Sequence, residues 1–170
     1  MNKQHGFTII ETLVYLGLFA IVMTGIISVA YGIFESSGRN QAKVMVQTEG
    51  NFILGKINWA MTGATSTSVT WPNLGATDSV LQVSKTGVPD PLCIRLNTGK
   101  VQMKTGSICS STTGYTDLNN SNITVSSLFF ARKGSVSGTE SIEASTTLQT
   151  LTPNGATYTQ TFTTTKYLRK

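Results

Sequence analysis

The hydrophobic pattern divides the chain into an unbroken apolar segment, a periodic segment and a long alternating region. From Thr12 to Phe34 no side chain carries a charge. At about 1.5 Å per residue, a helix of this length reaches across the roughly 30 Å hydrocarbon core of a membrane. The first segment is therefore predicted to be a helix that can span a membrane.

A second helical pattern follows the polar stretch that begins at Glu35. Apolar residues then recur at intervals of three, four or seven, which places them along one face of a helix: Ala42, Val46, Ile53, Ile57, Ala60 and Ala64. Met45, Phe52 and Trp59 form a second row and are expected to pack in the core. We predict one helix from Phe7 to about Thr62, whose amphipathic second half docks against a sheet.

Alternation typical of β-strands dominates the rest of the chain. Strands are predicted at 79–84, 92–96, 101–104, 123–130 and 156–165. Residues 97–100 form a good hairpin turn, and Pro153-Asn154-Gly155 forms another turn. In the last strand Tyr158 and Phe162 share one face and the threonines share the other. The order predicts an α+β fold in which one long helix packs on an antiparallel sheet.

The charge pattern gives little support to a nucleic-acid surface. The 170-residue chain has a formal net charge of +5, but only Arg132-Lys133 and Arg169-Lys170 are adjacent basic pairs. A nucleic-acid footprint requires clustering on one face. A mildly basic solvated surface is favoured, and capture of DNA, or adhesion to a surface, by scattered Lys and Arg residues is kept as a weakly supported alternative.

The two cysteines, Cys93 and Cys109, lie far from the apolar segment. In an exported domain such a pair often forms a disulfide, and closing a loop of about 15 residues adds roughly 3 kcal/mol to stability. A bridge is therefore predicted, and two buried free thiols are the alternative.

Glu11 is an unusual residue at the start of the apolar segment, and three interpretations compete. A cleaved secretory signal would use Lys3 as its basic start and cut after Ala30, but the apolar run continues to Phe34. A plain transmembrane helix leaves Glu11 without a role, although acids within membranes usually have one. The third interpretation explains more of the residues.

The stretch HGFTIIETLVYLGLFAIV resembles the processing signature of type IV pilins and their relatives. In that family a polar leader ends in Gly, an aromatic residue follows, and Glu is the fifth mature residue; Gly6, Phe7 and Glu11 occupy these positions. The resemblance implies cleavage after Gly6 and methylation of the new amino terminus at Phe7. The proline that many major pilins have in mid-helix is absent from residues 24–28.

The resemblance implies an organisation and a set of partners. Residues 1–6 would be the leader, 7–34 the transmembrane and assembly half of the helix, 35–62 its amphipathic half, and 63–170 an extracytoplasmic β-rich domain. The expected partners are a prepilin peptidase, other pilins or pseudopilins, and a membrane assembly platform. The expected location is the cytoplasmic membrane and then a pilus or pseudopilus filament, and late features suggest a minor pilin or J-like pseudopilin.

Electrostatics gives Glu11 a function within this resemblance. Cleavage would leave an ammonium at Phe7, at the positive end of a helix dipole. A carboxylate one turn later favours the helix start and can neutralise an ammonium. In pilin-like filaments the acid of one subunit is thought to meet the amino terminus of its neighbour, because two charges buried in an apolar bundle are tolerable only when paired.

The sequence offers no recognisable catalytic or metal-binding motif. The lone histidine, His5, lies in the proposed leader, so the mature chain would lack Ser-His-Asp and Cys-His catalysis and histidine-bearing zinc motifs. Asp78, Asp90 and Asp117 are isolated near turn residues, where capping is expected rather than calcium binding. No cofactor is expected. The expected function is a non-catalytic filament subunit, and a signal-anchored exported enzyme is the remaining alternative.

Overall fold

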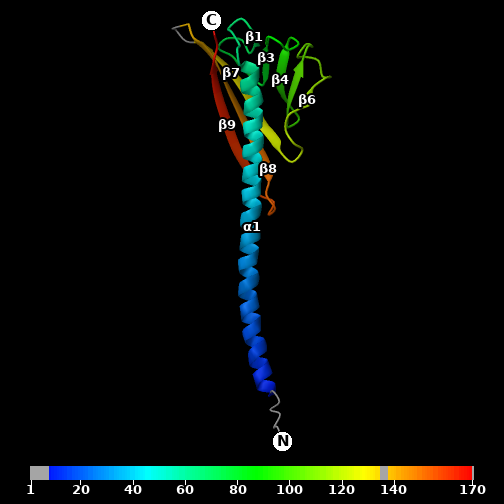
Figure 1. Cartoon of the computed structure of the whole chain (residues 1–170), viewed down its shortest axis with the longest axis vertical. Helices are drawn as coiled ribbons and strands as arrows, with labels where there is room; N and C mark the ends of the chain where they lie inside the picture. The colour runs from blue at the N-terminus through cyan, green and yellow to red at the C-terminus, as the bar shows by residue number, and fades with distance from the viewer. Residues whose placement is uncertain (1–7, 135–137, 170) are drawn as a thin grey trace. The chain divides into compact units, whose positions relative to one another are not determined.

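The computed structural model describes residues 8–134 and 138–169. One helix, α1 (Ile9–Met61), precedes a series of strands, as Figure 1 shows. The strands are β1 (Val69–Trp71), β2 (Thr77–Asp78), β3 (Val80–Val83), β4 (Leu92–Asn97), β5 (Lys100–Thr105), β6 (Thr116–Asp117), β7 (Thr124–Gly134), β8 (Glu140–Leu151) and β9 (Thr157–Tyr167). The predicted long helix and α+β class are confirmed.

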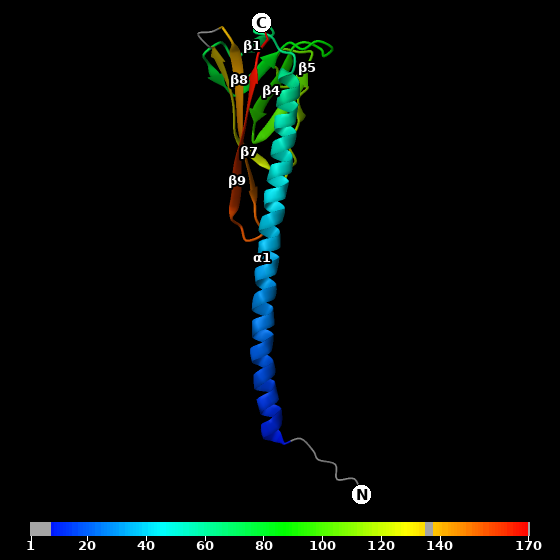
Figure 2. The same ribbon diagram turned by 60° about the vertical axis from the view of Figure 1, so that its left-hand side comes forward.

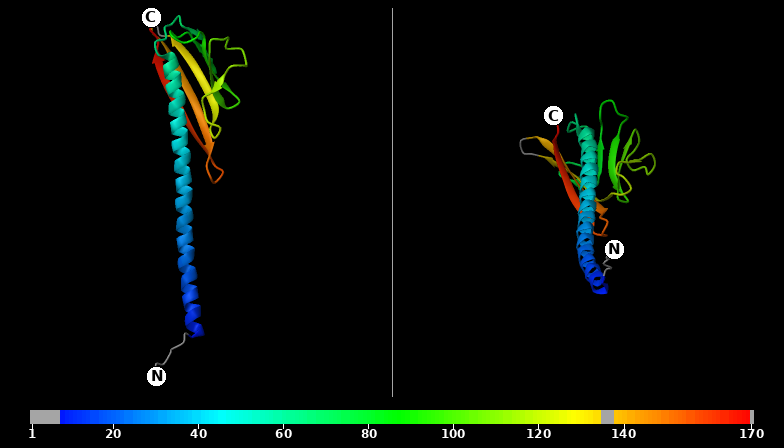
Figure 3. Two further views of the ribbon diagram at one scale, coloured as in Figure 1. Left: turned by 45° about the vertical axis from the view of Figure 1, so that its right-hand side comes forward. Right: turned by 60° about the horizontal axis from the view of Figure 1, so that its bottom comes forward.

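Two compact units divide the chain within α1, Met1–Asn40 and Gln41–Lys170. The second unit contains the end of the helix and two antiparallel sheets. Their strand orders are β1-β3-β4-β5-β6 and β2-β7-β8-β9. In this unit the helix lies against the strands, as Figures 2 and 3 show from other sides. The prediction had a single sheet, whereas the chain builds two.

The predicted hairpin between residues 92 and 104 is present. Asn97 pairs with Lys100 across the turn, and every residue of β4 pairs with one of β5. Thr98 and Gly99 both have positive φ, 46° and 76°. Positive φ at both central residues is the geometry that lets a two-residue turn follow the twist of the strands. The turn thus sets the register of the pair at the centre of the first sheet.

The core joins the end of α1 to both sheets. Val46, Ile53 and Ile57 are fully buried on the helix, and they belong to one cluster with residues of both sheets. Its large strand members include Leu81, Ile94, Phe130, Ile142 and Leu148. Burying one such side chain contributes about 1.5–3 kcal/mol. The predicted docking of the amphipathic half is therefore confirmed, and apolar burial accounts for it.

Gly50 permits a close approach of α1 to the Phe162 ring of β9. A Cβ atom at this position would lie 2.4 Å from ring atoms of Phe162. The side chain of Thr164, on the same face of β9, reaches Asn58 of the helix, with 3.0 Å between Oγ1 and Oδ1. The glycine lowers helix propensity, but it makes room for the aromatic ring. It therefore acts as a packing position within the helix.

The prediction that Met45, Phe52 and Trp59 pack in the core is wrong. These side chains are 38%, 46% and 43% exposed. Both apolar rows share the heptad spacing, so periodicity alone cannot say which one faces the sheets. The row lies beside the buried stripe, where lysine side chains cover the rings: Lys56 lies over Phe52 and Lys85 over Trp59.

Lys85 also closes the end of α1. Its Nζ donates to the carbonyl oxygens of Trp59 and Thr62 at 2.8 and 2.7 Å. The last carbonyls of a helix have no partner within the helix, and a cation is favoured near them. Gly63 follows with φ of 80°, a conformation that ends helices readily. The lysine contacts and the glycine together explain why the helix ends near residue 62, as predicted.

A buried arginine ties the helix exit to the second sheet. Arg132 of β7 is only 9% exposed. Its Nη1 donates to the carbonyl of Val69 at 2.8 Å, and its Nη2 donates to the carbonyl of Ser66 and to Glu140, both at 2.7 Å. One guanidinium therefore joins the segment after α1, strand β1 and strand β8.

Candidate functional site

Glu11 lies in the first turn of α1. Its backbone N–H donates to the carbonyl of Thr8 at 3.1 Å, so the helical turn is formed at this residue. The residue is exposed. Its neighbours Ile9 and Ile10 are 82% and 70% exposed. A carboxylate thus stands at the amino-terminal end of the helix, where negative charge is favoured, on a surface that is otherwise apolar.

The first half of α1 exposes a continuous apolar surface. Every large apolar side chain from Ile9 to Phe34 is more than a third exposed. Soluble monomers rarely expose apolar patches beyond a few hundred Å². By length and composition this helix can cross a membrane. The surface therefore requires lipid or other apolar helices around it.

The two threonine hydroxyls on this surface bond within the helix. Thr12 Oγ1 donates to the carbonyl of Ile9, and Thr24 Oγ1 donates to that of Ala20, both at 2.8 Å. A polar group in hydrocarbon is costly unless it is hydrogen-bonded. Because both hydroxyls have partners, they do not oppose burial of this face, and Glu11 is the charged residue that a partner must balance.

The apolar surface ends at a charged pair one turn apart. The guanidinium of Arg39 donates to Glu35 at 2.5 Å. Pairs at this spacing stabilise helices by a few tenths of a kcal/mol. Before the pair, a Cβ atom added at Gly17, Gly25 or Gly32 would meet no other atom within 4 Å. These open positions allow a neighbouring helix to approach closely.

Gly6 and Phe7, the predicted cleavage and methylation positions, lie outside the described residues, as does His5. The position of the mature amino terminus therefore stays a prediction. The structure does describe Glu11, four residues after Phe7 in the sequence, and the apolar helix that follows it.

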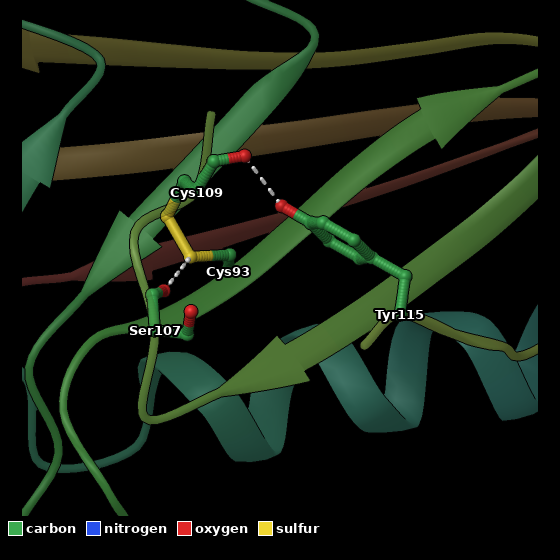
Figure 4. Close-up of a disulfide and its surroundings, with 4 residues drawn as sticks. All are labelled: Cys93, Ser107, Cys109 and Tyr115. Carbon is green, nitrogen blue, oxygen red and sulfur yellow. Dashed lines mark hydrogen bonds between the residues drawn. A yellow bond between two sulfur atoms is a disulfide. The ribbon is translucent and has the colours of Figure 1, made fainter. Parts of the chain in front are cut away.

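Cys93 and Cys109 form a disulfide, shown in Figure 4. Their Cα atoms are 5.6 Å apart. Cys93 is buried on β4, while Cys109 lies in the loop after β5. Tyr115 donates from its hydroxyl to the carbonyl of Cys109 at 2.7 Å, and the guanidinium of Arg95 stacks on its ring at 3.7 Å. The bridge and the tyrosine thus hold this loop on the first sheet.

The double substitution Cys93→Ser with Cys109→Ser is expected to lower the free energy of unfolding by about 3 kcal/mol. The reason is that the bridge joins residues 16 positions apart and so restricts the unfolded chain. Urea unfolding of the oxidised full chain and of the double variant measures the difference. The reduced wild-type chain serves as the control, and it should match the double variant. An unchanged midpoint in both would contradict a stabilising bridge.

The described residues contain no cluster of side chains that would hold a metal ion. Within 8–134 and 138–169, no three His, Cys, Asp or Glu residues gather as metal ligands would. Asp78 accepts from the backbone N–H of Val80 at 3.2 Å, and Asp117 accepts from the Gln102 amide at 2.7 Å. These two carboxylates make local structural hydrogen bonds.

Several basic side chains are engaged within the molecule. Lys100 donates to the carbonyls of Asn119 and Asn120, and Lys133 pairs with Glu143. Arg132 is buried, as described above, and Lys104 is 6% exposed beside the ring of Tyr115. Nucleic-acid surfaces need clustered cations that phosphates can reach. These contacts do not favour such a surface.

Residues 1–27 match the family model described as the prokaryotic N-terminal methylation motif. This is the type IV pilin-like prepilin signature, and the long helix on antiparallel sheets is a pilin-like α+β architecture. The chain therefore combines a type IV pilin-like prepilin signature with a pilin-like architecture, and the signature supports a protein of the pilus or pseudopilus kind. No curated protein and no solved structure matched the chain.

The motif has consequences for processing and location. It implies cleavage by a prepilin peptidase and association with other pilins. With the apolar helix, it fits a membrane-anchored pilin that is later assembled into a filament. It also points to a structural subunit rather than an enzyme. Glu11 lies within the matched residues, whereas the disulfide and both sheets lie beyond them.

Proposed function

We propose that this chain is a minor, non-catalytic subunit of a type IV pilus or type II secretion-like filament. The observation that carries the proposal is one carboxylate, Glu11, at the start of the exposed apolar first half of α1 and inside the methylation motif. A lone acid at that place serves no purpose for a simple anchor. It suits a helix that leaves the bilayer and packs among similar helices.

The proposed processing creates the charge that Glu11 balances. A cut after Gly6 gives Phe7 a free amino group, which remains cationic when methylated. In a packed apolar bundle an unpaired ammonium or carboxylate costs several kcal/mol, so each favours the other as a partner. We propose that Glu11 of one subunit pairs with the amino terminus of a neighbour and fixes their vertical register.

The rest of the chain has separate roles in this proposal. Residues 7–34 anchor the subunit and then assemble, 35–62 connect this part to the sheets, and 63–170 form the extracytoplasmic domain. The assembly platform in the cytoplasmic membrane would move the subunit from the bilayer to the filament. The minor role rests on the likeness of the chain's late strands to minor pilins and J-like pseudopilins.

The mature amino terminus tests the proposed processing. We expect the protein purified from its native membrane to begin at Phe7, with one added methyl group, as read by intact mass and amino-terminal peptide sequencing. A chain beginning at Tyr31 would identify a secretory signal instead, and an intact Met1 would identify a plain anchor. As a control, Gly6→Leu should leave the leader attached, because the peptidase requires a residue without a bulky side chain before the cut.

A further inference from the structure

A cleft lies between the end of α1 and the last residues of β9, within the unit 41–170. Its volume is about 430 Å³. Residues 61–64 form one wall, and Thr165, Lys166, Tyr167 and Arg169 form the other. Figures 1 and 2 show the carboxyl-terminal end of β9 beside the end of the helix. The cleft therefore joins two segments that are distant in sequence, and none of its lining belongs to the apolar surface of residues 9–34.

The wall formed by β9 carries unpaired backbone groups. Strand β9 is the last strand in the order β2-β7-β8-β9, so one of its edges is open. Leu168 donates its N–H to the carbonyl of Glu140 at 2.8 Å, which continues the β8–β9 register. Antiparallel residues alternate between bonded and unbonded pairs, so even-numbered residues of β9 bond to β8. Thr165 and Tyr167 therefore direct their N–H and C=O groups away from β8, and within 8–134 and 138–169 these groups have no backbone partner.

The segment that follows α1 begins a parallel ladder on this open edge. Arg169 donates its N–H to the carbonyl of Ala64 at 3.2 Å, and its own carbonyl accepts from the N–H of Ser66 at 3.1 Å, which is a parallel bridge. In the next step of such a ladder the N–H of Ala64 would bond to the carbonyl of Tyr167. It donates instead to Met61 at 3.1 Å. The ladder therefore stops at Ala64, and the cleft takes the place of its next residues.

Cationic residues line the cleft without a partner for their charge. Lys166 is half-buried and Arg169 is exposed, and among the described residues neither side chain makes an ion pair or a hydrogen bond. None of the eight lining residues is acidic. The helix end opposes an anion little, because Lys85 already donates to the carbonyl of Thr62. A half-buried ammonium without a counter-charge favours an anionic partner.

The open edge and the charge together select one kind of occupant. Thr165 and Tyr167 offer acceptors as well as donors, which matches an extended polypeptide backbone. Residues 64–66 already cover the edge at Arg169, so a polypeptide added beside Thr165 has to end at the cleft. A strand parallel to β9 would bring its carboxylate to this end, whereas an antiparallel strand would bring its ammonium. Lys166 and Arg169 favour the carboxylate and oppose the ammonium.

We propose that this cleft binds the carboxyl terminus of a partner protein as an extended strand parallel to β9. The N–H of the partner's last residue donates to the carbonyl of Thr165, its carboxylate accepts from the N–H of Tyr167, and Lys166 and Arg169 balance its charge. Strand addition at a sheet edge and capture of a terminal carboxylate by backbone N–H groups are both established modes of peptide recognition. The inference goes beyond the proposed filament function and uses none of the apolar surface of α1.

Two peptides that differ only at the carboxyl terminus test the proposal. The probe is Thr-Val-Thr-Val-Thr-Val, labelled with a fluorophore at its amino terminus and ending in a carboxylate or in a carboxamide. It is titrated with the full-length chain in detergent micelles, and binding is read by fluorescence anisotropy. We expect the acid to bind at least about tenfold more tightly than the amide, because hydrogen bonds to a charged group are the stronger ones. Residue-resolved NMR should show the N–H groups of Thr165 and Tyr167 exchanging more slowly once the acid is bound. Equal affinities, or no binding up to about 1 mM, would overturn the proposal.

Lys166→Gln and Arg169→Gln are the matched variants, and Lys43→Gln, an exposed position on α1 outside the cleft, is the control. Each cleft variant should weaken binding of the acid by about tenfold and leave the amide unchanged, while the control binds both peptides as the wild type does. A protected Leu168 amide establishes that a variant is folded. Cleft variants that bind the acid like the wild type, or inorganic phosphate that shifts the Thr165 and Tyr167 signals where the acid peptide does not, would reject peptide capture. No filament is needed, so this failure is distinct from a failure of the proposed function.

Discussion

Replacing Arg132 by alanine is expected to lower the free energy of unfolding by about 3–5 kcal/mol. The guanidinium is almost fully enclosed and bonds to Glu140 and to the carbonyls of Ser66 and Val69. The variant leaves the Glu140 carboxylate without its cation and two carbonyls without their donors. Buried polar groups that lose a partner cost far more than the net value of the bond they made. Urea unfolding of the full chain in micelles measures the loss.

The adjacent residue provides the control. Lys133 also pairs with a glutamate across β7 and β8, but its side chain is 63% exposed. Exposed pairs contribute about 0–1 kcal/mol, so Lys133→Ala should change stability little. If both substitutions lowered the free energy of unfolding equally, burial of Arg132 would not explain how much this residue stabilises the fold. Arg132→Lys is expected to fall between them, because an ammonium cannot reach all three partners in the same plane.

The long helix and the last strand could be predicted from the sequence because each has an unambiguous period. The apolar run to Phe34 and the stripe through Val46, Ile53 and Ile57 predict a helix, and the alternation of Tyr158 and Phe162 with threonines predicts β9. The helix bounds differ from the prediction by a residue or two. In the part of the chain that the structure describes, these elements have the predicted type, but on the helix only the stripe through Val46, Ile53 and Ile57 is buried, and the predicted core row of Met45, Phe52 and Trp59 is not.

Strand β8 could not be found in the same way. Its buried side includes Ala144, Thr146 and Thr150, so hydrophobicity alternates weakly along it. The two threonines are buried because their hydroxyls donate to the carbonyls of Ser127 and Asn122. Such hydrogen bonds join residues distant in sequence, so they cannot be predicted from a local sequence pattern. Without β8, the division into two sheets was also hidden.

Among the functional and structural side chains, too, those defined by nearby residues could be predicted and those defined by distant contacts could not. Glu11 was identified from its spacing to Gly6 and from the apolar helix, which are local features. Arg132 was visible only as half of a basic pair, because its contacts to Ser66 and Val69 span more than sixty residues. The open edge of β9 depends on strand order, which no single strand encodes.

Glu11→Gln is expected to reduce incorporation into the proposed filament by roughly 100- to 4000-fold. Glutamine is similar in shape and keeps hydrogen-bonding capacity, but it cannot balance the amino-terminal charge of a neighbour. Breaking one side of a buried ion pair costs about 3–5 kcal/mol, and each 1.4 kcal/mol is about a factor of ten in an equilibrium. Sheared filaments are separated from membranes, and the chain is quantified in both fractions by mass spectrometry.

Glu35→Gln is the matched control, since Glu35 lies on the same helix beyond the apolar surface and pairs with Arg39 at a solvent-exposed position. This variant should enter filaments at nearly the wild-type level. Membrane insertion of both variants should remain normal, because removing a charge does not oppose insertion. The amino terminus of Glu11→Gln must be sequenced as well, so that a loss of assembly is separated from a loss of cleavage. A processed Glu11→Gln chain that assembles as well as Glu35→Gln would exclude the charge pair as the basis of register.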